Sequence, residues 1–340
     1  MNNSSGVSIS VHQQSSNKMH LAELVSWCII NGLVAILAIF GNSLVIAAFV
    51  CFKKLRTRTT YFVVGLAAAD ILVGLLSIPF WIATMVSIWL ESVSWMGNSL
   101  LYRAFIALDV FSGIASILHL LLISLERLYA IGWPVRHRVS SRRSYLFSAS
   151  MAWCITLGAA AMFVPEKNLT HFPRFLVLQL CFFIPLVLIC MTYIMMWIIV
   201  KCHTHDANSW NNHKETKLIL TIFLLIILFV AAWAPFMAVN TITFLCVKCF
   251  IPNNVVYFSK LLHYSNSAVN PLVYSYRLPD FKKAFYILLK DRQRWQHSSL
   301  RTESFFKLKN KSQRQGRYSP AKKGHEKARD FNHILEVWGV

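Results

Sequence analysis

Charged residues are scarce in this chain. Of its 340 residues, 14% are charged and only 14 are Asp or Glu, whereas 56% are apolar. Ordinary soluble domains carry about 25% charged residues. A soluble fold could not bury this much apolar surface, so the composition excludes an ordinary soluble domain and favours a chain that lipid surrounds.

Motifs of enzymes, transporters and exported soluble proteins are also lacking. No HExxH, GxSxG or comparable catalytic motif occurs, and His119 and His263 are isolated, so we expect no enzyme. No internal repeat points to a transporter. The polar first 20 residues lack a basic segment followed by a short apolar core. We therefore expect no cleaved signal peptide, and expect the first long apolar span to direct membrane insertion.

The eight cysteines do not form the pattern of a disulfide-rich domain, because six lie in or beside apolar segments. Free cysteine in such places packs as a small hydrophobic residue. Cys246 and Cys249 differ, since only two residues separate them in a loop. Zinc would need further ligands nearby, and none are evident. We predict a disulfide between these two cysteines, provided that the loop faces an oxidising compartment.

The net charge is +20. So positive a charge often indicates nucleic-acid binding. Here, however, residues 277–340 hold sixteen Lys and Arg against six Asp and Glu, which is half of the excess, and short loops hold most of the rest. We therefore expect no nucleic acid as a partner, and contact with the anionic lipid of a bilayer instead.

Seven apolar segments predict an all-α membrane protein with a seven-transmembrane helix bundle. Each approaches or exceeds the ~20 residues that cross a bilayer as a helix. The segments are 24–50, 60–88, 99–131, 146–164, 174–201, 216–245 and 254–276. After the last one, DFKKAFYILLK predicts a short amphipathic helix on the inner leaflet. This divides the chain into a tail (1–23), the helical domain (24–291) and a basic tail that its composition predicts to be disordered (292–340).

Basic residues favour alternate loops, which predicts the orientation in the membrane. The loops at 51–59 and 132–145 each carry four Lys or Arg, and the intervening loops carry far fewer. The positive-inside rule then places the N-terminus outside and the C-terminus in the cytoplasm of a multi-pass membrane protein. Glycosylation triplets at Asn2, Asn3 and Asn168 all fall on the predicted outer side, so we expect a glycoprotein.

Ionisable residues inside a span are costly, so each is a functional-site hypothesis. Asp70 lies in the second span, and other spans supply amide and hydroxyl oxygens, at Ser116, Asn266, Ser267 and Asn270. Such oxygens suit a small hard cation such as sodium. A hydrogen-bond network between helices, with water, is the alternative.

The third span carries Asp109 and Arg127, which lie eighteen residues apart. That is five helical turns, so the two share one face at a separation of about 27 Å. Asp109, nearer the outer mouth, could pair with a cationic ligand or with an internal partner, Arg103 or Lys260. Arg127, at the inner mouth, could form an ordinary ion pair or a breakable latch between helices.

Aromatic residues gather in the sixth and seventh spans, where they either pack the bundle or line a ligand cleft that offers ring faces to a cation. Periodicity does not separate these alternatives. The residues are Phe229, Trp233, Phe236, Phe244, Tyr257 and Tyr264.

Together these residues resemble the rhodopsin-like (class A) family of G-protein-coupled receptors over residues 24–290. The family's marks follow in order along the seven spans: GNSLV around Asn42, LAAAD ending at Asp70, Glu126-Arg127, Trp153, Pro185 with Tyr193, Trp233-Ala234-Pro235, and Asn270 to Tyr274. The resemblance implies a receptor that binds a small extracellular agonist and activates an intracellular heterotrimeric G protein, with arrestin as a further partner.

The resemblance also implies roles for individual residues. It places the ligand at Asp109, Trp233, Phe236, Asn240 and Tyr264. It assigns G-protein coupling and activation to Glu126, Arg127, Tyr193, Glu215, Phe229, Asn270, Pro271 and Tyr274. It implies no cofactor beyond an allosteric sodium ion, held among Asp70, Ser116, Asn266, Ser267 and Asn270.

Two subgroups compete for the ligand. Residues 61–74 and 263–277, with Asn240, look like adenosine receptors. Asp109 instead stands where amine receptors place the carboxylate that pairs with the ligand's ammonium, and Tyr264 matches a companion of that aspartate. An ammonium gains a charge-assisted hydrogen bond from a buried carboxylate, and a neutral purine gains nothing. We therefore expect a cationic amine, with an adenosine-like purine as the alternative.

The chain departs from the family where a disulfide usually ties the third span to the second outer loop. Tyr102 takes the place of the span-three cysteine, and residues 164–180 contain no cysteine. This departure keeps a further alternative open, a receptor-like partner protein that does not itself signal.

Overall fold

The computed structural model describes residues 19–92, 100–164, 171–203, 209–246 and 248–290, and these residues form helices joined by turns and short connections, with no strand. The predicted tails fall mostly outside these ranges, so their boundaries stay predictions. The elements in order are α1 (Leu21–Cys51), η1 (Lys53–Leu55), α2 (Arg58–Leu72), η2 (Val73–Ser77), α3 (Ile78–Trp89), α4 (Leu100–Gly132), α5 (Pro134–Val139), α6 (Arg142–Ala161), α7 (His171–His203), α8 (Ser209–Leu245), α9 (Asn253–Arg277) and α10 (Pro279–Lys290).

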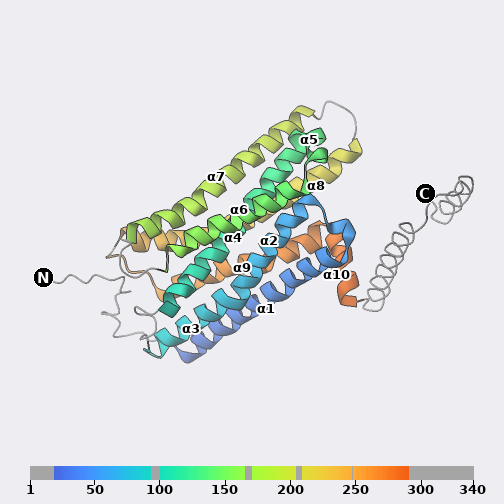
Figure 1. Ribbon diagram of the computed structural model, residues 1–340. Coiled ribbons are helices and arrows are strands. Elements are labelled where there is room, and N and C mark those ends of the chain that lie inside the picture. Colours follow the sequence, from blue (N-terminus) through green and yellow to red (C-terminus); the bar gives the residue numbers. More distant parts are fainter. Residues whose placement is uncertain (1–18, 93–99, 165–170, 204–208, 247, 291–340) are drawn as a thin grey trace, which may run out of the picture. The chain divides into compact units, whose positions relative to one another are not determined.

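The long helices lie side by side as a bundle, with α4 running through its middle (Figure 1). α4 packs against α2, α6 and α7, α1 packs against α2 and α9, and α8 packs against α9. We call one end of the bundle the α10 end, where α5 and α10 lie, and the opposite one the α3 end, where α3 stops and α4 and α9 begin (Figure 1). A side chain's place along α4 therefore fixes its depth between the two ends.

Six helical segments of the described chain are long and apolar enough to cross a membrane: Leu21–Cys51, Arg58–Trp89, Leu100–Gly132, Arg143–Ala161, Phe172–Ile199 and Ile226–Leu245. The seventh is α9, whose 25 residues reach about 38 Å, which exceeds a hydrocarbon core of about 30 Å. α9 is less apolar because it turns many polar residues into the bundle, among them His263, Asn266 and Asn270. The predicted seven-helix bundle is confirmed.

Unlike a soluble protein, this bundle exposes many large apolar side chains and buries several polar ones. Large apolar side chains point outward on the outer helices, for example Ile36, Phe147 and Met191, which are 63%, 68% and 60% exposed. Polar side chains lie inside, and Asn42 and Asp70 are fully buried. Continuous exposed apolar surface of this kind needs lipid around it. The protein is therefore a multi-pass membrane protein.

Proline and glycine shape the helices where they meet. The second span contains a π-helical turn, η2, directly before Pro79 at the start of α3, and such turns are frequent at functional sites. Pro185, Pro235 and Pro271 lie inside α7, α8 and α9. A Cβ on Gly41 would lie 2.9 Å from Cγ of Pro271, so only glycine permits this approach of α1 to α9.

The short helix α10 follows α9 after a single residue, Leu278. Phe281 and Phe285 on its inner face are buried, and the Phe281 ring lies 5.8 Å from that of Tyr274 in α9. Lys282 and Lys283 are exposed. This is the amphipathic helix that the sequence predicts after the seventh span.

Candidate functional site

A buried ion pair joins α4 to α9 near the α3 end. The Lys260 ammonium donates to the Asp109 carboxylate, with Nζ 2.5 Å from Oδ2. The two side chains are only 12% and 10% exposed, so solvent screens the pair weakly. The sequence leaves a cationic ligand and an internal partner open for Asp109, and in the structure the partner is internal, Lys260.

Three aromatic rings, which we call the aromatic cage, surround the Lys260 ammonium. Its Nζ lies 4.2 Å from the ring centroid of Phe236, 5.3 Å from that of Tyr264 and 5.6 Å from that of Trp81. Ring faces within about 6 Å attract a cation through their quadrupoles. Asp109 and the cage therefore form a built site for an ammonium group, and Lys260 occupies it.

Two buried polar atoms near this ammonium lack a hydrogen-bond partner among the described residues. They are Oδ1 of Asp109 and Nδ1 of His263. Nε2 of His263 approaches Oδ1 of Asp109 only to 4.0 Å. Buried polar atoms are nearly always satisfied, so two atoms without partners mark a place that a ligand or water can complete.

Of the other predicted ligand residues, Trp233 lies near this site and Asn240 makes a local bond. The amide of Asn240 donates to the carbonyl of Phe236, one turn earlier in α8, at 3.0 Å. Trp233 packs its ring edge-on against His263, with centroids 4.1 Å apart. Sequence reasoning did not assign Trp81 and His263 to this site, and nothing in the local pattern around either residue marks it.

Trp233 connects four helices beside the ion pair. Its ring lies 5.3 Å from that of Phe229 in α8 and 5.5 Å from that of Phe182 in α7. On the α4 side it rests directly on Gly113, where any Cβ would overlap the indole. Trp233 thus joins His263, which lies beside the ion pair, to α7 and α4 by direct contact.

Midway along the bundle, Asp70, Ser116 and Asn270 form what we call the polar centre. The amide of Asn270 donates to Oδ2 of Asp70 at 2.7 Å, and the Ser116 hydroxyl donates to Oδ1 at 3.3 Å. Asn42 in α1 donates to the carbonyl of Ser267 in α9 at 2.9 Å. The structure brings together these predicted residues, and Asn266 and Ser267 are also buried in α9.

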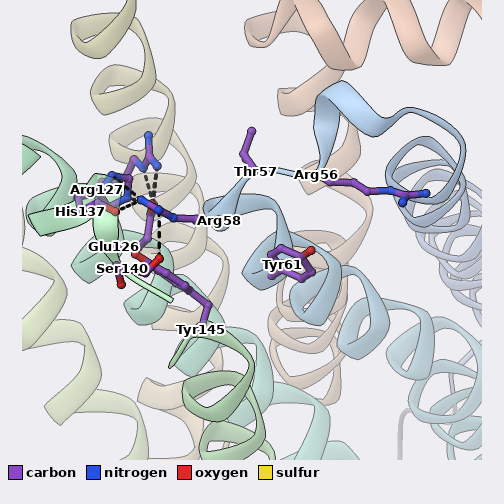
Figure 2. Close-up of a pocket in the computed structure, with 9 residues that line it drawn as sticks. All are labelled: Arg56, Thr57, Arg58, Tyr61, Glu126, Arg127, His137, Ser140 and Tyr145. Carbon is purple, nitrogen blue, oxygen red and sulfur yellow. Dashed lines mark hydrogen bonds and ion pairs between the residues drawn. The ribbon is translucent and has the colours of Figure 1, made fainter. Parts of the chain in front are cut away.

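A second charged group, which we call the Arg127 cluster, lies at the α10 end (Figure 2). Arg127 donates to its neighbour Glu126 through Nε at 2.6 Å and through Nη2 at 2.7 Å. Thr59 in α2 accepts from Arg127 and donates to Glu126 at 2.7 Å. His137 in α5 lies 2.8 Å from the other oxygen of Glu126. The cluster thus ties α4 to α2 and α5.

An open pocket of about 420 Å³ lies beside this cluster (Figure 2). Arg58, at the start of α2, holds one wall by donating to the backbone carbonyls of His137 and Ser140. The pocket is lined by Arg56, Thr57, Arg58, Tyr61, Glu126, Arg127, His137, Ser140 and Tyr145. Thr59 and His137 were missed from the sequence, because both fall in segments that the hydropathy pattern predicts as loops, and nothing there indicates contact with Glu126.

Further predicted residues lie elsewhere in the bundle or outside the described part. The rings of Tyr193 in α7 and Phe223 in α8 stack at 4.6 Å. Cys246 and Cys249 form a disulfide in the loop after α8. Glu215 falls within α8, but its side chain is not among those described. The three predicted glycosylation sites, Asn2, Asn3 and Asn168, also lie outside the described residues.

Comparison with known proteins agrees with this architecture. Residues 41–274 match the family described as 7 transmembrane receptor (rhodopsin family). This is more than half of the chain. The chain belongs to the rhodopsin family of seven-transmembrane receptors. It is therefore a G-protein-coupled receptor for a small ligand and not an enzyme.

Relatives of this receptor fall into two groups by name. It is 29% identical to adenosine receptor A3 of Ovis aries over 294 residues, which cover 78% of this chain and 90% of that relative. It is 28% identical to 5-hydroxytryptamine receptor 2C of Homo sapiens over 327 residues, which cover 74% and 69%. It is 27% identical to octopamine receptor beta-1R of Drosophila melanogaster, over 80% of this chain and 63% of that relative. Purine and amine receptors are thus both among its relatives.

Proposed function

We propose that this receptor lies in the plasma membrane with its N-terminus outside, and that it binds a cationic amine where Lys260 now contacts Asp109. The observation that carries the proposal is the built ammonium site. A carboxylate and three ring faces already hold a primary ammonium there, at 2.5 Å and at 4.2 to 5.6 Å. An amine agonist would take the same position and free Lys260.

The agonist would act by shifting a population between two states of the bundle. A ligand can shift this equilibrium only by its difference in affinity for the two states. The path of contact runs from Lys260 and His263 to Trp233, which touches α4, α7 and α9. Pro235, two residues after Trp233, allows α8 to bend there.

At the α10 end, the proposal assigns Arg127 to G-protein coupling. In the present arrangement Glu126 and Thr59 occupy the guanidinium of Arg127. Activation would release Arg127 from this cluster so that the G protein can contact it, and arrestin would use the same end of the bundle. Tyr193, Tyr274 and Glu215 belong to this step by their resemblance to the family pattern.

A sodium ion is proposed to act at the polar centre as an allosteric ligand. Asp70 is fully buried and contacts only amide and hydroxyl groups there. Carboxylate and hydroxyl oxygens are the ligands that a small hard cation prefers. Asp70 and Ser116 would hold the ion, with Asn270 turned to offer its amide oxygen.

An adenosine-like purine is the second candidate ligand. It is favoured by the similarity to adenosine receptor A3 and by the ion pair itself, since a neutral purine would leave Lys260 and Asp109 bound to each other. In that case Asp109 would have a structural role. A receptor-like partner that does not signal is the third possibility.

The deciding experiment records G-protein nucleotide exchange in membranes that contain the receptor, against a panel of amines and adenosine. Asp109→Asn is measured beside the wild type, and Asp109→Asn with Lys260→Met serves as the charge-balanced control. An amine response that both variants lose supports the amine proposal. An adenosine response that survives in the charge-balanced variant refutes it. Exchange that no ligand stimulates in any G-protein class favours the non-signalling partner.

A further inference from the structure

The Lys260–Asp109 pair constrains the charge of any ligand that enters between the two residues. Both side chains are nearly buried, and each is the other's counter-ion. Removing one member of a buried ion pair is strongly destabilising because the charge left behind is uncompensated. A ligand therefore has to replace both partners' contacts.

Ligands with a single charge meet this requirement only in part. A simple amine would satisfy Asp109 but would push the Lys260 ammonium away from its carboxylate. A simple carboxylate would satisfy Lys260 but would leave Asp109 with His263, whose Nε2 stays 4.0 Å away. Either ligand leaves one buried charge without its partner, and this cost lowers the ligand's affinity.

A tethered lysine also competes with an amine for the site. The side chain of Lys260 is attached within reach of Asp109, so its effective concentration there is in the millimolar range or above. An amine that offers only an ammonium must outcompete this tethered group. An additional contact with the displaced lysine would recover the loss.

We propose that the agonist is a zwitterion of the amino-acid class, with an ammonium that replaces Lys260 on Asp109 and a carboxylate that pairs with the displaced Lys260. The inference rests on the proposed function, since it specifies the ligand of the same site. One ligand then forms two ion pairs in place of one and strands no charge. The flexible four-carbon stem of lysine lets its ammonium move without a change in α9.

The surroundings favour an amino acid with an aromatic side chain. An incoming ammonium brings three donors, and Oδ1 of Asp109, which has no hydrogen-bond partner in the described chain, can accept one of them. The rings of Phe236 and Trp81 flank the ammonium position and can pack against an aromatic side chain.

The test compares each amino acid with the amine that remains when its carboxylate is removed: L-tyrosine with tyramine, L-tryptophan with tryptamine, and L-histidine with histamine. Binding is measured on the purified receptor in lipid nanodiscs, and nucleotide exchange on added G protein is measured in parallel. For the wild type we expect at least one amino acid to bind about tenfold or more tightly than its amine, which is the usual scale of losing one charged partner.

Lys260→Met should reverse this preference, because it removes both the competitor for Asp109 and the partner of the carboxylate. Lys260→Arg, which keeps the charge, should retain the preference for the amino acid. Lys248→Met makes the same change at an exposed lysine of the α3 end, and it should behave as the wild type. If Lys260→Met is poorly folded, the double variant Asp109→Asn with Lys260→Met, which strands no charge, should lose the preference altogether.

Three results would overturn the inference. If amines bind the wild type more tightly than their amino acids and need Asp109 to do so, the zwitterion is wrong while the proposed amine function stands. If an amino acid binds equally well to wild type and Lys260→Met, Lys260 is not its partner. If no probe binds the wild type or Lys260→Met, both the inference and the proposed amine site fail together.

Discussion

The Arg127 cluster permits a quantitative prediction about agonist-free activity. Glu126 is the acceptor at its centre, with its side chain 1% exposed, and it receives both Arg127 and His137. Glu126→Gln keeps the size of the side chain but removes its charge. The amide that replaces one oxygen is a donor, and it would face another donor on Arg127.

The expected magnitude follows from the two short bonds of 2.6 and 2.7 Å between Arg127 and Glu126. A hydrogen bond to a charged group contributes about 1.5–3 kcal/mol, and the substitution loses the equivalent of about one such bond. Since about 1.4 kcal/mol is a factor of ten, the state with Arg127 released should gain about 10- to 100-fold. A receptor that is about 1% active without agonist would become about 10–50% active.

Agonist-free nucleotide exchange on a purified G protein, normalised to the number of folded receptors in the membrane, measures this change directly. Glu91→Gln, an exposed position in the turn after α3, is the matched control and should leave exchange unchanged. Thr59→Val should raise exchange by a smaller factor than Glu126→Gln, because it leaves the ion pair between Arg127 and Glu126 in place. Thr59→Ser, which keeps the hydroxyl, should leave exchange unchanged. Folded Glu126→Gln receptor with exchange within twofold of the wild type would refute the view that this cluster restrains activation.

Three further predictions concern the interior of the bundle. Gly113→Ala should lower the melting temperature and weaken agonist-stimulated exchange, because the added Cβ would overlap Trp233 and overpacking costs about 1–3 kcal/mol. Gly158→Ala is the control for the thermal melt, because a Cβ there meets nothing within 4 Å. Replacing choline chloride by sodium chloride should reduce agonist affinity in the wild type and not in Asp70→Asn, as equilibrium binding would measure. Asn42→Ala should lower stability by about 1–3 kcal/mol in a thermal melt, since it strands a buried carbonyl of α9.

Much of the fold follows from the sequence, for reasons that are physical. A span has to be apolar over about 20 residues, so the apolar segments predict the helices to within a few residues over most of the chain. The sixth span is longer than predicted, since α8 begins at Ser209 and not near residue 216. Its first turns are polar, and hydropathy cannot detect a helix that continues beyond the bilayer.

The site was less predictable, because the sequence gives the depth of a residue and not its neighbours. The spacing of Asp109 and Arg127 correctly puts them at opposite ends of α4. It left Lys260 as one of several partners for Asp109, because choosing between them requires the packing of α9 against α4. The contacts of Trp81 and His137 depend equally on how distant helices meet, and no local motif encodes that.

The buried acids of the bundle suggest how its two ends communicate. Asp109 and Glu126 each have a cationic side chain of the same protein within 2.6 Å. Asp70, between them, has the neutral side chains of Ser116, Ser267 and Asn270 as its partners. A buried carboxylate without a counter-ion is costly, so the proposed sodium ion would stabilise this part of the bundle. A cation that neutralises Asp70 would stabilise the arrangement in which α2, α4 and α9 converge on it. Any motion of these helices that moves Ser116 and Asn270 away from Asp70 would make its buried charge more costly. If sodium binds at Asp70 as proposed, an agonist at Asp109 and that sodium ion should weaken each other's binding by equal factors, as linkage requires.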